Sequence, residues 1–449
     1  MKHLILKFRF PWKYALILLI GMAWGCDEEV LVPEEVKVTG IAIDGESEMA
    51  LNVGGSERLT ATIEPATATN KNIAWRTDNS AVATVTPSGW ISAVGPGTAV
   101  ISVITADGNK TDFCTVNVTY SEGSITAEER ALANQGGIIS NATILRAREI
   151  REKLNSNGLR SGAYIYRRSM IYGEDNNVVK LAARLKLLGI YDVYLSIQRE
   201  ALENTNVDAR NWLTNFMAAA HEMGLTVWAM RFEDPSHYNS TGVYPNIDAS
   251  LNTITTYNNS VNDNEKILAY SADYEPQMLS SGYTPWPSGL PNTSSYQWST
   301  LGYVTGSNNT LLTITINMLK YLRSQIGNTP LHQAVNTAFS GNAPNYGGAN
   351  LFLEPCDYLV SMSYYATGAQ IVNNTNATMT RAAMTSKPKS VSVAIKPTIN
   401  EHSGTINPRT WTNMMSIIDH IKTSYASQNV FRGVDFFEWE GLEQVWLTL

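Results

Sequence analysis

The feature that most constrains the fold is a regular alternation of strand-like and helix-like segments over residues 120–449. Eight short apolar, β-branched or aromatic runs are separated by longer stretches in which apolar residues recur with a helical period. The runs are 163–166, 192–197, 226–232, 267–272, 331–337, 358–363, 391–395 and 433–437, and the clearest helical stretches are 178–188, 210–223, 311–326 and 411–424. Eight strands alternating with helices over about 300 residues predict an α/β domain built as a (β/α)8 TIM barrel.

An open, doubly wound parallel sheet is the alternative for this segment. That fold usually places a glycine-rich phosphate loop after its first strand, whereas the first run here is followed by Arg167-Arg168-Ser169-Met170. Gly189 and Gly224 stand directly before two predicted strands, which is typical of glycines that end helices. We therefore favour the barrel, whose active sites lie at the carboxyl ends of the strands.

Two acidic residues follow the fourth run, in the order Ala272-Asp273-Tyr274-Glu275-Pro276. Because strand side chains alternate, Asp273 and Glu275 are expected on the same side, with Cα atoms about 6.5–7 Å apart. Two carboxylates this close repel, so one pKa rises and that group can hold a proton near neutral pH. This is the property that a general acid for glycosidic bond cleavage needs. A solvated or cation-paired strand end without a catalytic role is the alternative.

The same residues carry a resemblance to glycoside hydrolase family 18, the chitinases and endo-N-acetylglucosaminidases. Asp-x-Glu closing the fourth strand, Met362-Ser363-Tyr364-Tyr365 closing the sixth, and Gly433-Val434 with Trp439 beyond it resemble the motifs of that family. The resemblance implies that Glu275 protonates the leaving oxygen and that Asp273 steadies the 2-acetamido group of the substrate. It also implies that Tyr364 binds this acetamido group and that Trp439 floors the sugar site.

The chain departs from the family pattern at several positions. Ser271 and Leu268 stand where the family has aspartates on the fourth strand, and Tyr365 replaces the aspartate after the tyrosine. A competing assignment is that Glu275 before Pro276 resembles the acid/base of the large retaining glycosidase clan. Such an enzyme needs a second, nucleophilic glutamate, for which the candidates are Glu401, Glu438 and Glu440.

Further candidates for substrate binding stand near the predicted rim of the barrel. Tyr166, Arg231 and Asn336 end the first, third and fifth strands, Tyr365 follows the sixth, and Trp286 lies in the long polar segment after the fourth. Arg231 could instead pair with Glu233 or hold Asp273. His332, inside the fifth strand, is expected to be a hydrogen-bonded core residue.

Residues 37–119 predict a small all-β sandwich, because short alternating apolar segments recur there with turn residues between them. Val53-Gly54-Gly55, Leu59-Thr60-Ala61-Thr62, Trp75 and Val82-Ala83-Thr84-Val85 are similar to the bacterial Ig-like domains of group 2. The resemblance implies an extracellular spacer or adhesion module without chemistry, with Trp75 in its core. Cys114 and Cys356, far apart in sequence, are expected to be buried thiols.

The N-terminus predicts a lipoprotein. A basic start and the apolar run YALILLIGMA are typical of a signal peptide over residues 1–25. Ala23-Trp24-Gly25-Cys26 resembles a bacterial lipobox, which implies lipidation of Cys26 and a linker over 26–36. Asp27-Glu28-Glu29 resembles the surface-export signals of some Gram-negative lipoproteins. We expect a protein held at the outer membrane and cell surface by this lipid anchor.

Charge and residue spacing narrow the function further. The net charge is −7, and the first 25 residues hold four of the 33 basic residues and none of the acids. Such an acidic chain is a poor candidate for nucleic-acid binding, and its Cys and His residues show no metal-ligand spacing. We therefore expect a surface glycoside hydrolase that takes a glycan or polysaccharide without cofactor or metal. The alternative is a non-catalytic glycan-binding protein on a degenerate barrel.

Overall fold

The computed structural model describes residues 34–166, 177–233, 235–238, 242–275, 310–337, 348–399 and 407–448. The chain divides into two compact units, with the boundary between Thr119 and Tyr120. The described residues do not include the predicted signal peptide, Cys26 or most of the predicted linker. Trp286 also lies outside them. Within the described part of the chain, no helix has the length and apolar character to cross a bilayer.

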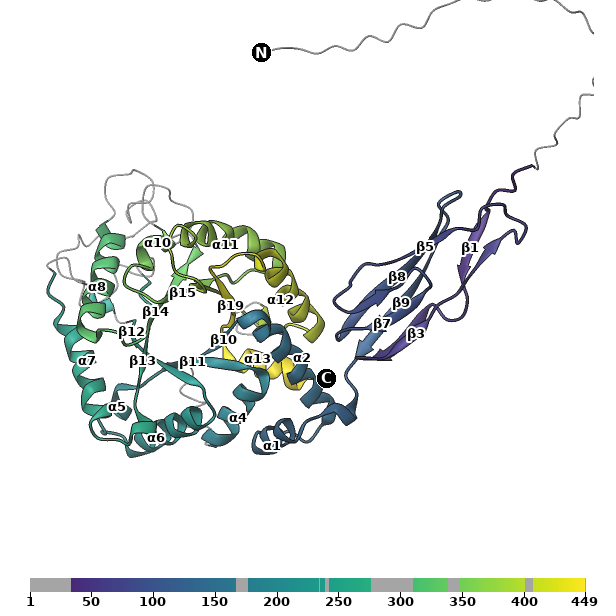
Figure 1. Ribbon diagram of the computed structural model, residues 1–449. Helices are drawn as coiled ribbons and strands as arrows, with labels where there is room; N and C mark the ends of the chain where they lie inside the picture. Colours follow the sequence, from purple (N-terminus) through teal and green to yellow (C-terminus); the bar gives the residue numbers. More distant parts are fainter. Residues whose placement is uncertain are drawn as a thin grey trace, which may run out of the picture. The chain divides into compact units, whose positions relative to one another are not determined.

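The first unit is a β-sandwich (Figure 1). Its strands are β1 (Gly40–Ile43), β2 (Glu48–Asn52), β3 (Ser56–Arg58), β4 (Ala61–Glu64), β5 (Ile73–Thr77), β6 (Ala83–Val85), β7 (Trp90–Ala93), β8 (Gly97–Thr105) and β9 (Thr111–Thr119). They form a four-stranded sheet (β2-β9-β8-β5), a three-stranded sheet (β3-β7-β6) and the pair β1-β4. Ile91, Ile101 and Cys114 are fully buried between the sheets, and Trp75 packs against this core while partly exposed. The predicted sandwich is confirmed.

The second unit contains a closed barrel of eight parallel strands in chain order (Figure 1). The strands are β10 (Ser161–Ile165), β11 (Ile190–Ser196), β12 (Thr226–Phe232), β13 (Ala269–Ala272), β14 (Leu331–Asn336), β15 (Tyr358–Met362), β16 (Val391–Ile395) and β19 (Phe431–Phe436). The barrel closes where Ala163 of β10 pairs with Phe436 of β19. All eight predicted strands are present, each within two residues of its expected ends, and the open sheet is excluded.

Helices follow the strands and surround the barrel (Figure 1). They are α1 (Ala127–Gln135), α2 (Asn141–Asn155), α4 (Val178–Leu188), α5 (Arg199–Leu202), α6 (Val207–Glu222), α7 (Pro245–Asn258), α8 (Thr310–Ile326), α10 (Ala349–Phe352), α11 (Gly368–Ala382), α12 (Trp411–Tyr425) and α13 (Trp439–Leu447). Short 3-10 turns are η1 (Glu122–Ser124), η2 (Ser156–Gly158), η3 (Pro235–His237) and η4 (Asp263–Glu265), and β17 (Thr398–Ile399) pairs with β18 (Asn407–Pro408). Gly189 ends α4 in the left-handed conformation, with φ of 77°, as its position before a strand predicts.

Strand side chains alternate between two cores. The outer core, between strands and helices, mixes aliphatic and aromatic residues and includes Val193, Leu195 and Phe216. The inner cluster fills the barrel and is largely aromatic, with Tyr164, Tyr194, Trp228 and Tyr358 among its members. The barrel interior is therefore a packed core with many polar atoms, which sets the chemistry of its open end.

A buried ion cluster closes the amino-terminal end of the barrel. Asp192 accepts hydrogen bonds from Arg160 (2.7 and 2.9 Å), from Arg432 and from Trp228 Nε1 (2.9 Å). Burial alone would raise the pKa of Asp192, but Arg432 and Arg160 hold it below its ordinary value. The guanidinium of Arg432 also lies 3.9 Å from the ring centre of Tyr358. The cluster links the starts of strands β10, β11, β12 and β19.

Candidate active site at the barrel mouth

The end of the fourth strand, β13, places one carboxylate inside the barrel. Asp273 continues the pairing with β12, since its N–H donates to the carbonyl of Phe232 at 3.0 Å. The next side chain, Tyr274, points the other way: its hydroxyl lies 2.9 Å from His237 Nδ1 and its ring packs in the outer core. Alternation along the strand therefore directs Asp273 inward, as the sequence predicts.

Asp273 is held by a tyrosine from the first strand. The hydroxyl of Tyr166 donates to Asp273 Oδ2 at 2.8 Å. The other oxygen, Oδ1, is buried and has no hydrogen-bond partner among the described residues. Burial raises the pKa of Asp273 to about 6, and the hydrogen bond from Tyr166 offsets part of this rise. About half of Asp273 is therefore protonated at pH 6 and about a tenth at pH 7.

Glu275, the predicted acid, lies close enough to share an electrostatic environment with Asp273. The charges of both carboxylates raise the pKa of Tyr238, whose ring lies after η3, although burial is the larger cause. Glu275 is partly exposed. The charges of the two acids thus reach the same buried hydroxyl, that of Tyr238 in the outer core.

Aromatic rings and one cation lie beside Tyr166, the hydrogen-bond partner of Asp273. The rings of Tyr166 and Tyr364 lie 5.2 and 5.1 Å from that of Phe437. The ammonium of Lys396 lies 4.7 Å from the ring centre of Tyr364 and 4.9 Å from that of Phe437. These five residues follow the ends of strands β10, β13, β15, β16 and β19, and we call them the mouth cluster. A carboxyl beside flat rings is suited to binding a sugar.

Two of the predicted substrate-binding residues are turned away from the mouth. Trp439, expected as the floor of the sugar site, is fully buried as the first residue of α13 and packs in the outer core. Its predicted position is wrong because β19 ends at Phe436 and the chain turns into a helix, so the alternation of the strand does not reach residue 439. Phe437 occupies the mouth instead. Tyr365 packs against the outer core, while its neighbour Tyr364 lies in the inner cluster.

The remaining candidates have varied surroundings. Asn336 ends β14 and, by alternation from the inward-facing His332, faces the barrel interior. Arg231 donates a hydrogen bond to the carbonyl of Ile197 at 3.5 Å. Among the described residues Asp273 forms no ion pair, so the predicted pair between Arg231 and Asp273 does not form. Glu401 lies outside the described residues, like Trp286. Glu440 is in the first turn of α13 with both carboxylate oxygens buried.

His332 differs from its prediction as a hydrogen-bonded core residue. It is fully buried, but neither ring nitrogen has a hydrogen-bond partner in the described part of the chain. Its ring lies between those of Tyr194, Trp228 and Tyr358, at 4.5, 5.2 and 5.0 Å. Burial lowers the pKa of His332 to about 3, so the ring is neutral.

Lys396, Phe437, Tyr164 and Asp435 were not predicted as site residues. Lys396 immediately follows the predicted strand 391–395 and Phe437 ends the predicted strand 433–437, so the alternation that identified Asp273 also applies to them. Asp435 is a fully buried acid inside β19 that accepts from Tyr194 (2.8 Å) and from the N–H of Gly162 (2.7 Å). Burial raises its pKa to about 6.

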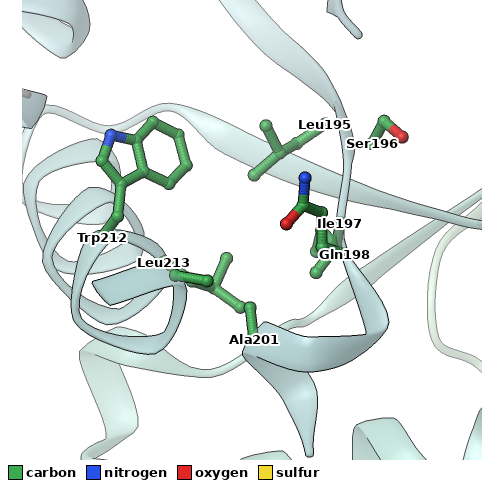
Figure 2. A pocket seen from close by; sticks show the side chains of 8 residues that line it. Leu195, Ser196, Ile197, Gln198, Ala201, Trp212 and Leu213 are labelled. Carbon is green, nitrogen blue, oxygen red and sulfur yellow. The ribbon is translucent and has the colours of Figure 1, made fainter. Parts of the chain in front are cut away.

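A small apolar pocket lies between β11, α5 and α6 (Figure 2). Leu195, Ala201, Trp212 and Leu213 line it, and all four belong to the outer core. It is therefore separate from the mouth cluster. Among the described residues, no group of three or more His, Cys, Asp or Glu side chains is arranged to hold a metal ion.

Comparison with known proteins identifies the first unit. Residues 37–116 match the family model of the bacterial Ig-like domain (group 2). An Ig-like virion protein of Serratia phage KSP90 is 40% identical over 100 residues, which cover 22% of this chain and 38% of that protein. An uncharacterised protein of Bacillus cereus is 32% identical over 91 residues, 20% of this chain and 68% of that protein. The chain thus spans well under half of the phage relative.

One solved structure extends over both units. A GH10 xylanase from termite gut that contains a bacterial Ig-like domain covers 87% of this chain and 91% of its own, with a TM-score of 0.30 and 10% identity. A likeness this distant leaves the function to be inferred from the barrel mouth itself.

Proposed function

We propose that this chain, which belongs to the proteins carrying a bacterial Ig-like domain of group 2, is a surface glycoside hydrolase that acts at its barrel mouth. The observation that carries the proposal is Asp273: a carboxyl with a pKa raised to about 6, bonded by Tyr166 and two residues from Glu275. Two neighbouring carboxyl groups, one to protonate the leaving oxygen and one to assist it, are what glycosidic cleavage requires. The rings of the mouth cluster supply stacking surfaces for a sugar.

In this proposal Glu275 is the general acid/base and Asp273 its partner. Glu275 donates a proton to the leaving glycosidic oxygen and then takes one from the attacking water. The resemblance to glycoside hydrolase family 18 implies a glycan with N-acetylglucosamine, whose 2-acetamido group attacks the anomeric carbon. Asp273 and Tyr364 then bind that acetamido group, and Phe437 takes the stacking role expected of Trp439.

The test is a hydrolysis screen of the soluble portion, from about residue 30, on N-glycans, chitin oligomers and plant or host polysaccharides. Glu275→Gln is expected to lower the cleavage rate by about 10²–10⁴-fold, the usual contribution of general acid catalysis, while binding is retained. Glu128→Gln, an exposed acid in the first turn of α1, is the matched control and leaves the rate unchanged. Equal rates for Glu275→Gln and the parent protein would refute the assignment.

A non-catalytic glycan-binding protein is the second candidate. Ser271 and Leu268 stand where family 18 has aspartates; Ser271 is buried in the barrel and Leu268 is 55% exposed. Binding of a glycan in the screen without cleavage by the parent protein would favour this candidate.

The surface location is part of the proposal. The Ig-like unit acts as a spacer, and lipidation of Cys26 after cleavage of residues 1–25 anchors the chain at the outer membrane. Mass spectrometry of the N-terminal peptide tests the lipid directly. In Cys26→Ala the protein is expected to leave the membrane fraction, while an unchanged membrane fraction would contradict the anchor.

A further inference from the structure

Directly below the mouth, four side chains carry buried polar atoms that form no hydrogen bond with any described residue. These atoms are Tyr164 Oη, Ser271 Oγ, Asp273 Oδ1 and both ring nitrogens of His332. Tyr164 is 1% exposed, and Ser271 and His332 are 0% exposed. Leaving such a buried group without a hydrogen bond destabilises the folded state. Buried polar groups without a protein partner are normally bonded to ordered water.

The four side chains are neighbours. Ser271 precedes Asp273 by two residues on the same strand face, and it pairs in register with His332 of β14. The ring of Tyr164 stacks on that of Tyr166 at 5.8 Å, and Tyr166 bonds Asp273. These contacts place the unsatisfied atoms in one region under Asp273.

Tyr194 connects this region to a second carboxyl. Its ring lies 4.4 Å from that of Tyr164 and 4.5 Å from that of His332, and its hydroxyl donates to Asp435. Beyond the effect of burial, the charges of both Asp273 and Asp435 raise the pKa of Tyr164. The hydroxyl of Tyr164 therefore remains protonated and lies within electrostatic reach of two acids.

The other titratable groups around Asp273 come from several elements. They are Tyr166 after β10, Tyr238 after η3, Glu275 on its own segment, Tyr364 after β15, Lys396 after β16 and, below, Tyr358, His332 and Asp435. Of these, only Tyr166 forms a direct hydrogen bond with Asp273 among the described residues. Oδ1 is thus the atom left for a further donor.

We propose that Tyr164, Ser271 and His332 enclose ordered water beneath Asp273, and that Tyr164 is a positioning residue which donates through this water to Asp273 Oδ1. The hydroxyl of Tyr164 donates a hydrogen bond to the water oxygen, and the water in turn donates a hydrogen bond to Asp273 Oδ1. Neutral His332 and Ser271 each offer a further donor and acceptor to the same water. A donor directed at the charged carboxylate favours that form, so the water holds the pKa of Asp273 below the value that burial alone would give.

The test measures protonation of Asp273 and is independent of any hydrolytic activity. Infrared difference spectra between the parent and Asp273→Asn isolate the C=O stretch of the protonated carboxyl and give its titration midpoint. The same subtraction in a Tyr164→Phe background, which removes one oxygen, is expected to shift this midpoint upward by about one pH unit. Tyr257→Phe, which removes a buried hydroxyl bonded to Glu265 between the helices, is the control and leaves the midpoint unchanged.

Ser271→Ala provides a second variant if Tyr164→Phe does not fold, and the same upward shift is expected. A crystal structure of the parent is expected to show a water within hydrogen-bond distance of Asp273 Oδ1. An unchanged midpoint in a folded Tyr164→Phe or Ser271→Ala, or a dry interior beneath Asp273, would overturn the inference. Because a catalytically inactive barrel would still titrate, failure here is distinct from failure of the proposed function.

Discussion

The hydroxyl of Tyr166 donates a 2.8 Å hydrogen bond to Asp273, which joins the end of the first barrel strand to the end of the fourth. Burial raises the pKa of Tyr166 well above its ordinary value, so this group stays a donor over the whole physiological range. The bond orients Asp273 Oδ2 and leaves Oδ1 for another partner. It thereby fixes the position of the Asp273 carboxyl relative to the end of the first strand.

Tyr166→Phe is expected to raise the pKa of Asp273 further above about 6, because the bond stabilises the ionised carboxyl. The expected rise is about one unit, and the infrared titration described for Tyr164→Phe measures it. Tyr425→Phe, whose hydroxyl bonds the carbonyl of Val372, serves as the control. A midpoint that does not move would mean that Tyr166 only fills space.

The free energy of unfolding is expected to fall on both the acidic and the alkaline side of its maximum. Although burial opposes it, Arg148 and the Thr126 N–H lower the pKa of Glu129 from 4.5 to about 2. Its contribution is therefore present above pH 4.5 and lost as the pH falls towards 2. Burial raises the pKa of Asp435 from 3.8 to about 6, so its contribution is full below 3.8 and lost as the pH rises through 6.

From these two groups we expect the melting temperature to be highest between about pH 3.8 and 4.5 and to fall as the pH rises to about 6. The raised pKa of Asp435 corresponds to about 3 kcal/mol. Asp435→Asn should flatten the alkaline limb, and calorimetry across pH checks this. An alkaline limb as steep as that of the parent would exclude Asp435 as its cause.

The ion pairs of Glu129 predict a large loss of stability on neutralisation. Glu129 binds Arg148 and Arg151, and the side chain of Arg148 is only 8% exposed. Glu129→Gln leaves a buried guanidinium without its counter-charge, which should cost about 3–5 kcal/mol in urea unfolding. Asp263→Asn removes an exposed pair with Lys266, where Asp263 is 96% exposed, and should leave the urea midpoint nearly unchanged. Similar losses for the two variants would refute this account.

Gly433, in β19, is required by a close backbone approach. A Cβ at this position would lie 2.1 Å from the carbonyl oxygen of Arg160, which immediately precedes β10. Gly433→Ala should therefore destabilise the barrel by about 3 kcal/mol or more, measured by thermal unfolding. Gly123→Ala is the control, because its Cβ would lie 3.7 Å from Ser121 Oγ, and it should change stability by less than about 1 kcal/mol. Equal melting temperatures would disprove the steric argument.

The sequence predicts the barrel well because its strands are buried on both faces and are therefore predominantly apolar, as at Val391–Ile395, where Ser392 is the one polar residue. It also predicts the inward direction of Asp273, which needs only alternation within one strand. It does not predict where alternation stops: β19 ends before Trp439, and only tertiary structure fixes that turn. The sequence did not predict the buried surroundings of Asp435 and His332, because it does not show which buried polar groups face one another inside a barrel.

The exchange of Trp439 for Phe437 at the mouth gives a direct test of the site. Phe437 lies among Tyr166, Tyr364 and Lys396, while Trp439 is 0% exposed in the outer core. Phe437→Ala should weaken glycan binding by about tenfold, since one stacking ring contributes about 1 kcal/mol or more, with a smaller effect on stability. Trp439→Ala should instead cost about 3–5 kcal/mol of stability and leave the binding of the folded fraction unchanged. Binding isotherms and urea unfolding on both variants separate the two roles, and a loss of binding confined to Trp439→Ala would restore the role that the sequence first assigned to it.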